Sequence, residues 1–231
     1  MNPSIRSSMF VGDADQTFLP PRPMATSSVV DMRILELLTS RLCHEMSGPI
    51  AAVNNGIELL GEEGDDFQSE ALALVGDSAR RASLQLQFYR FAYGFSCGRA
   101  MAGAAPPELA ARFFDTTRLA CDYDESVGLL PLDSQKLACN LLLVGAEALS
   151  RGGSLSLTDG PQGLDLQIVG EGAFLSPEVS AALALATPVA ALTSRTVQAY
   201  FAGLLAEALG RRLVHAAEPR RVRLTAVALT G

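Results

Sequence analysis

The chain has 231 residues, 48% of them hydrophobic, and a formal net charge of −7. This apolar content excludes a disordered chain, and the length allows one large domain or two small ones. The negative charge argues against nucleic acid and anionic membrane surfaces as partners. Only two histidines and four widely spaced cysteines are present, which argues against a metal site or a disulfide framework. Neither a signal peptide nor a membrane span is expected, so we predict a cytoplasmic protein.

The first third of the chain predicts a tail and two long helices. Residues 1–28 mix prolines with small polar residues and are expected to be a disordered tail. Apolar residues then recur at helical spacing over residues 31–61 and again, as heptads, over residues 72–93. A short polar turn between them predicts an antiparallel hairpin domain at residues 29–98. Because two helices cannot enclose a core, we expect two copies to pair as a homodimeric four-helix bundle.

The remainder of the chain predicts a second domain at residues 105–231, after a stretch rich in glycine and proline. Its pattern predicts helices at 109–117, 133–150, 176–185 and 194–209, and strands at 118–123, 154–158, 164–169, 212–216 and 222–229. Helices on one face of a mostly antiparallel sheet form a two-layer α/β sandwich. The predicted fold class is therefore α+β, with a long helical hairpin followed by a sandwich.

His44 is the candidate reactive residue of the first helix. At about 100° per residue it points away from the apolar stripe of that helix. Its neighbours on this outer face are small or polar, and they are the predicted partner-binding residues: Ser40, Ser47, Gly48, Ala51 and Asn55. A face of small side chains lets another protein approach the ring. Neutral imidazole is a nucleophile that forms a transferable phosphoramidate, so we predict that His44 accepts phosphoryl groups.

Three further residues near His44 have predicted roles. Glu45 is expected to accept a hydrogen bond from one ring nitrogen and so to orient the imidazole. Pro49 removes a helical hydrogen bond to the carbonyl of Glu45 and should weaken the helix there. Arg41, at the edge of the outer face, is a candidate helper for the phosphoryl group, and an ordinary ion-paired helix residue is the alternative.

The run from His44 to Ile50, His-Glu-Met-Ser-Gly-Pro-Ile, resembles the phospho-acceptor box of sensor histidine kinases. In that family the hairpin precedes an ATP-binding sandwich, and the same layout is predicted here. The resemblance fails at the nucleotide-binding boxes. Val144 stands where a second asparagine would hold magnesium, Gly170 replaces the aspartate that would bind adenine, and Phe174 replaces a glycine that admits phosphate. We therefore expect no cofactor of its own and no autokinase activity.

A kinase-like hairpin with an intact histidine box and a degenerate nucleotide site resembles the ChpT-type histidine phosphotransferases of alphaproteobacteria. The runs at residues 40–45, 54–60 and 145–153 are similar to that family. The resemblance implies a phosphorelay in which phosphate passes from the receiver domain of a hybrid histidine kinase to response regulators of the cell cycle. The magnesium ion would belong to the partner receiver domain. Two alternatives stay open: an active histidine kinase with divergent boxes, and a non-catalytic dimeric interaction module.

Overall fold

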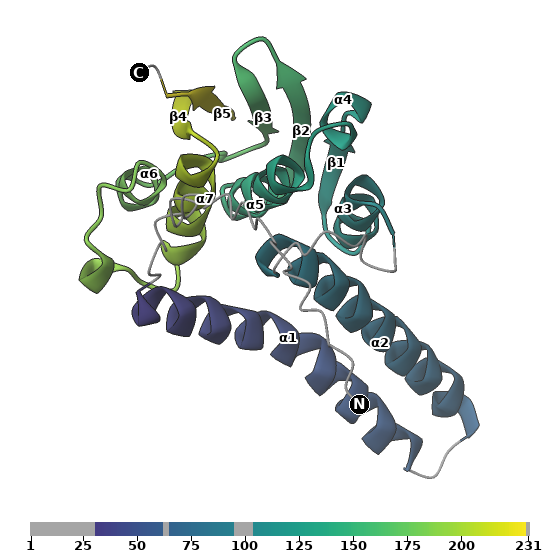
Figure 1. Ribbon diagram of the computed structural model, residues 1–231. Coiled ribbons are helices and arrows are strands. Elements are labelled where there is room, and N and C mark those ends of the chain that lie inside the picture. Colours follow the sequence, from purple (N-terminus) through teal and green to yellow (C-terminus); the bar gives the residue numbers. More distant parts are fainter. Residues whose placement is uncertain (1–30, 62–64, 95–103, 230–231) are drawn as a thin grey trace, which may run out of the picture. The chain divides into compact units, whose positions relative to one another are not determined.

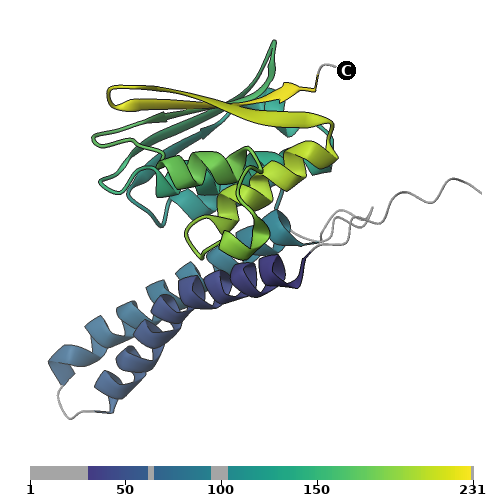
Figure 2. The same ribbon diagram turned by 90° about the vertical axis from the view of Figure 1, so that its left-hand side faces the viewer.

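The computed structural model describes residues 31–61, 65–94 and 104–229. Its first part is an antiparallel pair of long helices, α1 (Met32–Leu60) and α2 (Asp65–Tyr93), which lie side by side in both views (Figures 1 and 2). Asp31 caps α1 by accepting a hydrogen bond from the Arg33 amide at 2.9 Å, which satisfies one of the free donors at the helix start. The predicted helical hairpin is confirmed.

The two helices are in close contact at Gly56, which is buried against α2. A Cβ atom at this position would lie 2.6 Å from Cγ2 of Val75 and 3.3 Å from the carbonyl oxygen of Ala71. Such distances are shorter than van der Waals contact, so any larger residue would force the helices apart. Gly56 therefore sets the spacing of the hairpin on the half that carries the turn.

Apolar side chains also lie on a solvent-facing side of the hairpin. On α1, Ile50 and Ile57 keep 51% and 55% of their surface exposed, and on α2, Leu72 and Leu86 keep 60% and 52%. Helical periodicity places these four residues on the same side of the hairpin, away from His44. We call them the apolar stripe. A stripe that continues over two adjacent helices is typical of a surface that pairs with another protein.

The second part contains a five-stranded sheet in the order β1-β2-β3-β5-β4. The strands are β1 (Leu119–Tyr123), β2 (Gly153–Gly160), β3 (Gly163–Val169), β4 (Arg211–Glu218) and β5 (Arg221–Ala228). β1 runs parallel to β2, and the other neighbouring pairs are antiparallel. Leu157 lies opposite Leu166, which lies opposite Leu224 on the next strand. All three are fully buried and form a row on one face of the sheet.

The helices of the second part are α3 (Pro106–Phe114), α4 (Glu125–Gly128), α5 (Leu132–Glu147), α6 (Pro177–Leu183) and α7 (Val197–Ala208), with a 3-10 turn, η1 (Val189–Ala191), before α7. Three of them, α3, α5 and α7, contact both the sheet and the hairpin and lie between them, and the others pack around these (Figure 2). The end of α2 joins the same core, because the buried ring of Phe88 stacks on Phe113 with ring centroids 4.4 Å apart. Aromatic packing of this kind ties the hairpin to the sandwich.

The α+β class and the mostly antiparallel sheet agree with the prediction, and several details differ. The helix expected at 109–117 is α3, which starts at Pro106, where proline suits the first turn of a helix, and ends at Phe114. The short elements α4 and η1 were not predicted. The helix expected to begin at residue 194 begins at Val197, because the Thr196 hydroxyl accepts a hydrogen bond from the Thr193 amide and holds a turn before it. The predicted tail at 1–28 lies outside the described residues. The boundary between the two domains lies largely outside them too, so the division at 29–98 and 105–231 stays a prediction. Within the described ranges, no helix has both the length and the apolarity of a membrane span.

Candidate functional site

His44 lies exposed near the middle of α1. The neighbours expected on its outer face are exposed as well: Ser40, Ser47, Gly48, Ala51 and Asn55. The hydroxyl of Ser47 donates a hydrogen bond to the carbonyl of Cys43 at 2.7 Å, so it lies against its own helix. The imidazole is thus surrounded by a level surface of short side chains, which we call the histidine face.

Pro49 lies within α1, which continues as one helix to Leu60. Proline has no amide hydrogen, so the carbonyl of Glu45 lacks its usual helical donor. A carbonyl without its helical donor therefore lies one residue after His44, on the turn that carries the imidazole.

Glu45 points toward the interior of the hairpin. Its carboxylate lies 3.9 Å from Nη2 of Arg41, and burial together with this carboxylate raises the pKa of Tyr89 on α2. Among the hydrogen bonds of the described residues, none joins Glu45 to His44. The proposed orienting role of Glu45 stays a prediction that would need a rotation of one of the two side chains.

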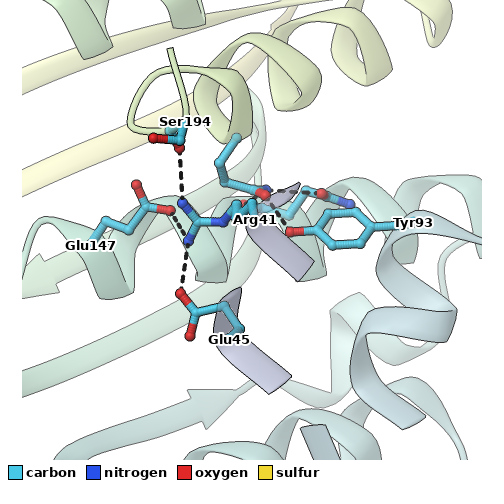
Figure 3. A network of polar contacts seen from close by, with 7 residues as sticks. Arg41, Glu45, Tyr93, Glu147 and Ser194 are labelled. Carbon is cyan, nitrogen blue, oxygen red and sulfur yellow. Dashed lines mark hydrogen bonds and ion pairs between the residues drawn. The ribbon is translucent and has the colours of Figure 1, made fainter. Parts of the chain in front are cut away.

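Arg41, one turn before His44, points into the junction between α1 and the sandwich (Figure 3). Its Nη2 lies 2.6 Å from a carboxylate oxygen of Glu147 at the end of α5, and its Nη1 donates to the carbonyl of Ser194 at 3.5 Å. Only 14% of the Arg41 side chain is exposed, and its buried Nε has no hydrogen-bond partner among the described residues. Charge pairing therefore holds a largely buried guanidinium between three chain segments.

Glu147 is the residue of this junction that sequence reasoning missed. Burial raises the pKa of its carboxyl to about 7, and the positive charge of Arg41 opposes that rise. The signal that could have found this pair is the position of Arg41 on α1. A cation near the buried edge of an amphipathic helix needs an anionic partner on the element packed against it.

A second polar chain lies beside Arg41 and links α2, α7 and α5 (Figure 3). The Tyr93 hydroxyl donates to Oε1 of Gln198 at 2.6 Å, and Nε2 of Gln198 donates to Oδ1 of Asn140 at 3.0 Å. Asn140 is fully buried, and its Nδ2 donates to the carbonyls of Ala92 and Lys136, both at 2.8 Å. Asn140 lies one helical turn before Val144 on α5, and its side-chain amide is fully engaged in hydrogen bonds within the protein.

A cleft of about 1020 Å³ lies next to this network, between α5, α6 and the segment before α7. Val144, Glu147, Phe174 and Arg195 are among its lining residues. Val144 is buried and offers no ligand oxygen, whereas Phe174 is 63% exposed. Gly170 does not line the cleft, and a Cβ atom there would lie 2.6 Å from the carbonyl oxygen of Gly152. These residues do not fit a nucleotide with magnesium.

Comparisons with known proteins agree with this geometry. Residues 106–221 match the family described as the histidine phosphotransferase C-terminal domain. Over 198 residues the chain is 34% identical to protein phosphotransferase ChpT of Brucella abortus (strain 2308). The aligned region covers 83% of this chain and 93% of the relative. A solved bacterial phosphotransferase, determined at 1.7 Å, matches with a TM-score of 0.70 and 30% identity, over 86% of this chain and 98% of its own.

The family match over the sandwich, together with the relative and the solved structure, identifies the class as the bacterial histidine phosphotransferases. The Brucella relative is 34% identical over most of this chain, and the match to the solved structure extends over 98% of that structure's chain. The chain belongs to the ChpT-type histidine phosphotransferase family.

Proposed function

We propose that the protein relays phosphoryl groups between the aspartates of receiver domains through His44, and that it does so without ATP. Family membership supports phosphotransfer in a phosphorelay. The observation that carries the role of His44 is its exposure on the level histidine face of α1. The proposed donors and acceptors are the receiver domains of a hybrid histidine kinase and of response regulators.

The transfer proposed at His44 is an in-line displacement. A ring nitrogen attacks the phosphorus of a receiver aspartyl phosphate, the new P–N bond forms, and the P–O bond to the aspartate breaks. The aspartate leaves as a carboxylate, and the imidazole gives its proton to solvent. The receiver would bring the magnesium ion that neutralises the phosphoryl oxygens, and the reverse reaction would load the next receiver.

The second domain supports a relay without nucleotide. An active kinase would need ligand groups where this chain has Val144 and Gly170, and an open phosphate site where it has Phe174. Titration calorimetry with magnesium and ATP is therefore expected to show no binding at micromolar concentrations. Labelling of the protein from ATP alone would instead favour the active kinase.

We also propose that the protein acts as a homodimer in the cytoplasm. The apolar stripe on α1 and α2 would be covered when two hairpins form a four-helix bundle, and this stripe is on the side of the hairpin opposite to His44. Both histidine faces would then stay accessible to receivers. Cys43, Cys121 and Cys139 are free thiols, which fits a reducing compartment.

Incubation with a radiolabelled phosphorylated receiver domain tests the function directly. The wild-type chain is expected to gain a label that is lost in acid and kept in alkali, as a phosphohistidine is. The His44→Gln variant should stay unlabelled with an unchanged circular dichroism spectrum. If this variant supports phosphate flow between two receivers as fast as wild type, the chain is an interaction module and His44 is incidental.

A further inference from the structure

We propose that Arg41 is a positioning residue, which fixes the second domain against the phospho-acceptor helix so that the histidine face and the cleft form one docking surface. This inference rests on the proposed function. It assigns to Glu147 and to the Ser194 carbonyl the task of holding Arg41. It also assigns to the degenerate second domain a mechanical task in transfer, in place of nucleotide binding.

The contacts of Arg41 reach all three segments that must be aligned. Its guanidinium pairs with Glu147 at 2.6 Å, bonds the carbonyl of Ser194 at 3.5 Å, and lies 3.9 Å from Glu45 on its own helix. Glu147 itself lines the cleft, and Ser194 directly precedes Arg195, another lining residue. A planar guanidinium with several donors is well suited to bridging a carboxylate and a carbonyl in one fixed geometry.

The same geometry argues against Arg41 as a ligand of the phosphoryl group. The Arg41 side chain is only 14% exposed, and both of its terminal nitrogens, Nη1 and Nη2, are directed to acceptors within the junction. Reaching a phosphoryl group on His44 would break the 2.6 Å ion pair and leave the Glu147 carboxylate without its cation. Arg41 therefore acts on transfer through the placement of α1, with the junction stiffened by the Tyr93–Gln198–Asn140 chain beside it.

Two phosphoryl donors of different size distinguish a positioning role of Arg41 from a direct role in the reaction at His44. A phosphorylated receiver domain needs the aligned docking surface, whereas phosphoramidate reaches the exposed imidazole without it. In the second reaction the ring nitrogen attacks phosphorus, the P–N bond of phosphoramidate breaks, and ammonia leaves with the proton that the imidazole gives up. The experiment measures both labelling rates for wild type, Arg41→Gln, Glu147→Gln and the double variant.

We expect Arg41→Gln and Glu147→Gln each to lower kcat/KM for the receiver roughly 10- to 100-fold, chiefly through a higher KM, because misplacement of about 1 Å has effects of that size. The double variant should be no slower than the slower single variant, since both changes open the same junction. Labelling by phosphoramidate should stay within about twofold of wild type. Arg112→Gln is the matched control, because it removes an exposed arginine–glutamate pair within α3.

Equal slowing with both donors would assign Arg41 a direct role in the chemistry and overturn the inference, as would unchanged receiver kinetics in both single variants. If Arg41→Gln does not fold, Arg41→Lys retains the charge but not the planar fork, and it is expected to give an intermediate KM. The Arg41→Lys and Glu147→Gln variants then decide the question. A wild-type chain that takes no label from any phosphorylated receiver would overturn the proposed function, and this inference with it.

Discussion

Arg41 and His44 belong to one turn of α1 and have opposite surroundings. His44 is exposed among short side chains, whereas Arg41 is largely buried and paired with a carboxylate from a distant segment. A helix can present both because side chains three residues apart differ in direction by about 60°. The proposed phospho-acceptor and the proposed positioning residue are thereby joined by less than one turn of helix.

Glu147→Gln is expected to remove a pH-dependent contribution to stability. Burial raises the pKa of Glu147 from its ordinary 4.5 to about 7, against the pull of Arg41. The native state therefore binds more protons than the unfolded chain between these two values, and this contribution falls as pH rises from 4.5 to 7. The groups that face this carboxyl are Arg41 and Glu45 from α1 and Tyr93 from α2.

Urea unfolding of wild type and Glu147→Gln across this pH range measures the effect. One third of the Glu147 side chain is exposed, so solvent screening should limit the change to about 1 kcal/mol. As pH rises from 4.5 to 7, the unfolding free energy of wild type should fall relative to that of Glu147→Gln. Above pH 7 the difference between the two proteins should become constant. Parallel curves for the two proteins would contradict the prediction.

Restoring single kinase residues is not expected to restore nucleotide binding. In a Val144→Asn and Gly170→Asp double variant, the new aspartate would meet the Gly152 carbonyl, because a Cβ atom at position 170 lies 2.6 Å from that oxygen. The backbone must shift, and we expect a loss of about 1–3 kcal/mol in the free energy of unfolding. Val144→Asn alone is the control for the second site. Calorimetric binding of magnesium and ATP by the double variant would show that the site is only two residues from function.

At the scale of elements, the contact between α1 and α2 depends on the absence of a side chain at Gly56. We expect Gly56→Ala to destabilise the fold by about 1–3 kcal/mol, because its methyl group would overlap Cγ2 of Val75. Gly76→Ala is the matched control, since a Cβ atom at this exposed helical position has no atom within 4 Å. It should stabilise the protein by about 0.5–1 kcal/mol through helix propensity. Thermal unfolding of the two variants should thus shift in opposite directions.

The elements themselves could be predicted from the sequence because their signals are local. Helical spacing of apolar residues identifies α1 and α2, and alternation with turn residues identifies the strands. The short α4 and η1 lack such a pattern. The Arg41–Glu147 pair could not be predicted for another reason. The two residues are far apart in the chain, and the sequence around each of them does not indicate which residue it contacts. Contacts of this kind depend on how elements pack, which periodicity alone does not specify.

For the whole molecule, the apolar stripe predicts that assembly and transfer are separable. A Leu72→Glu and Leu86→Glu double variant places charges on the stripe, where both leucines are more than half exposed. We expect monomers at micromolar concentration by analytical ultracentrifugation, because burying these charges in a helical seam is unfavourable. Wild type should sediment as a dimer. Phosphoramidate labelling of His44 should continue in the variant, and a variant that still sediments as a dimer would place the interface elsewhere.

The hydrogen bonds of the buried Asn140 amide limit what else this side chain can bind. In this chain the side chain of Asn140 forms hydrogen bonds with two carbonyls and with the side chain of Gln198, and so it stabilises the contact between the hairpin and the sandwich. A magnesium ion at this position would compete for the same side chain, so binding it would weaken that support. Stability of the junction and metal binding at residue 140 are therefore mutually exclusive uses of one amide side chain.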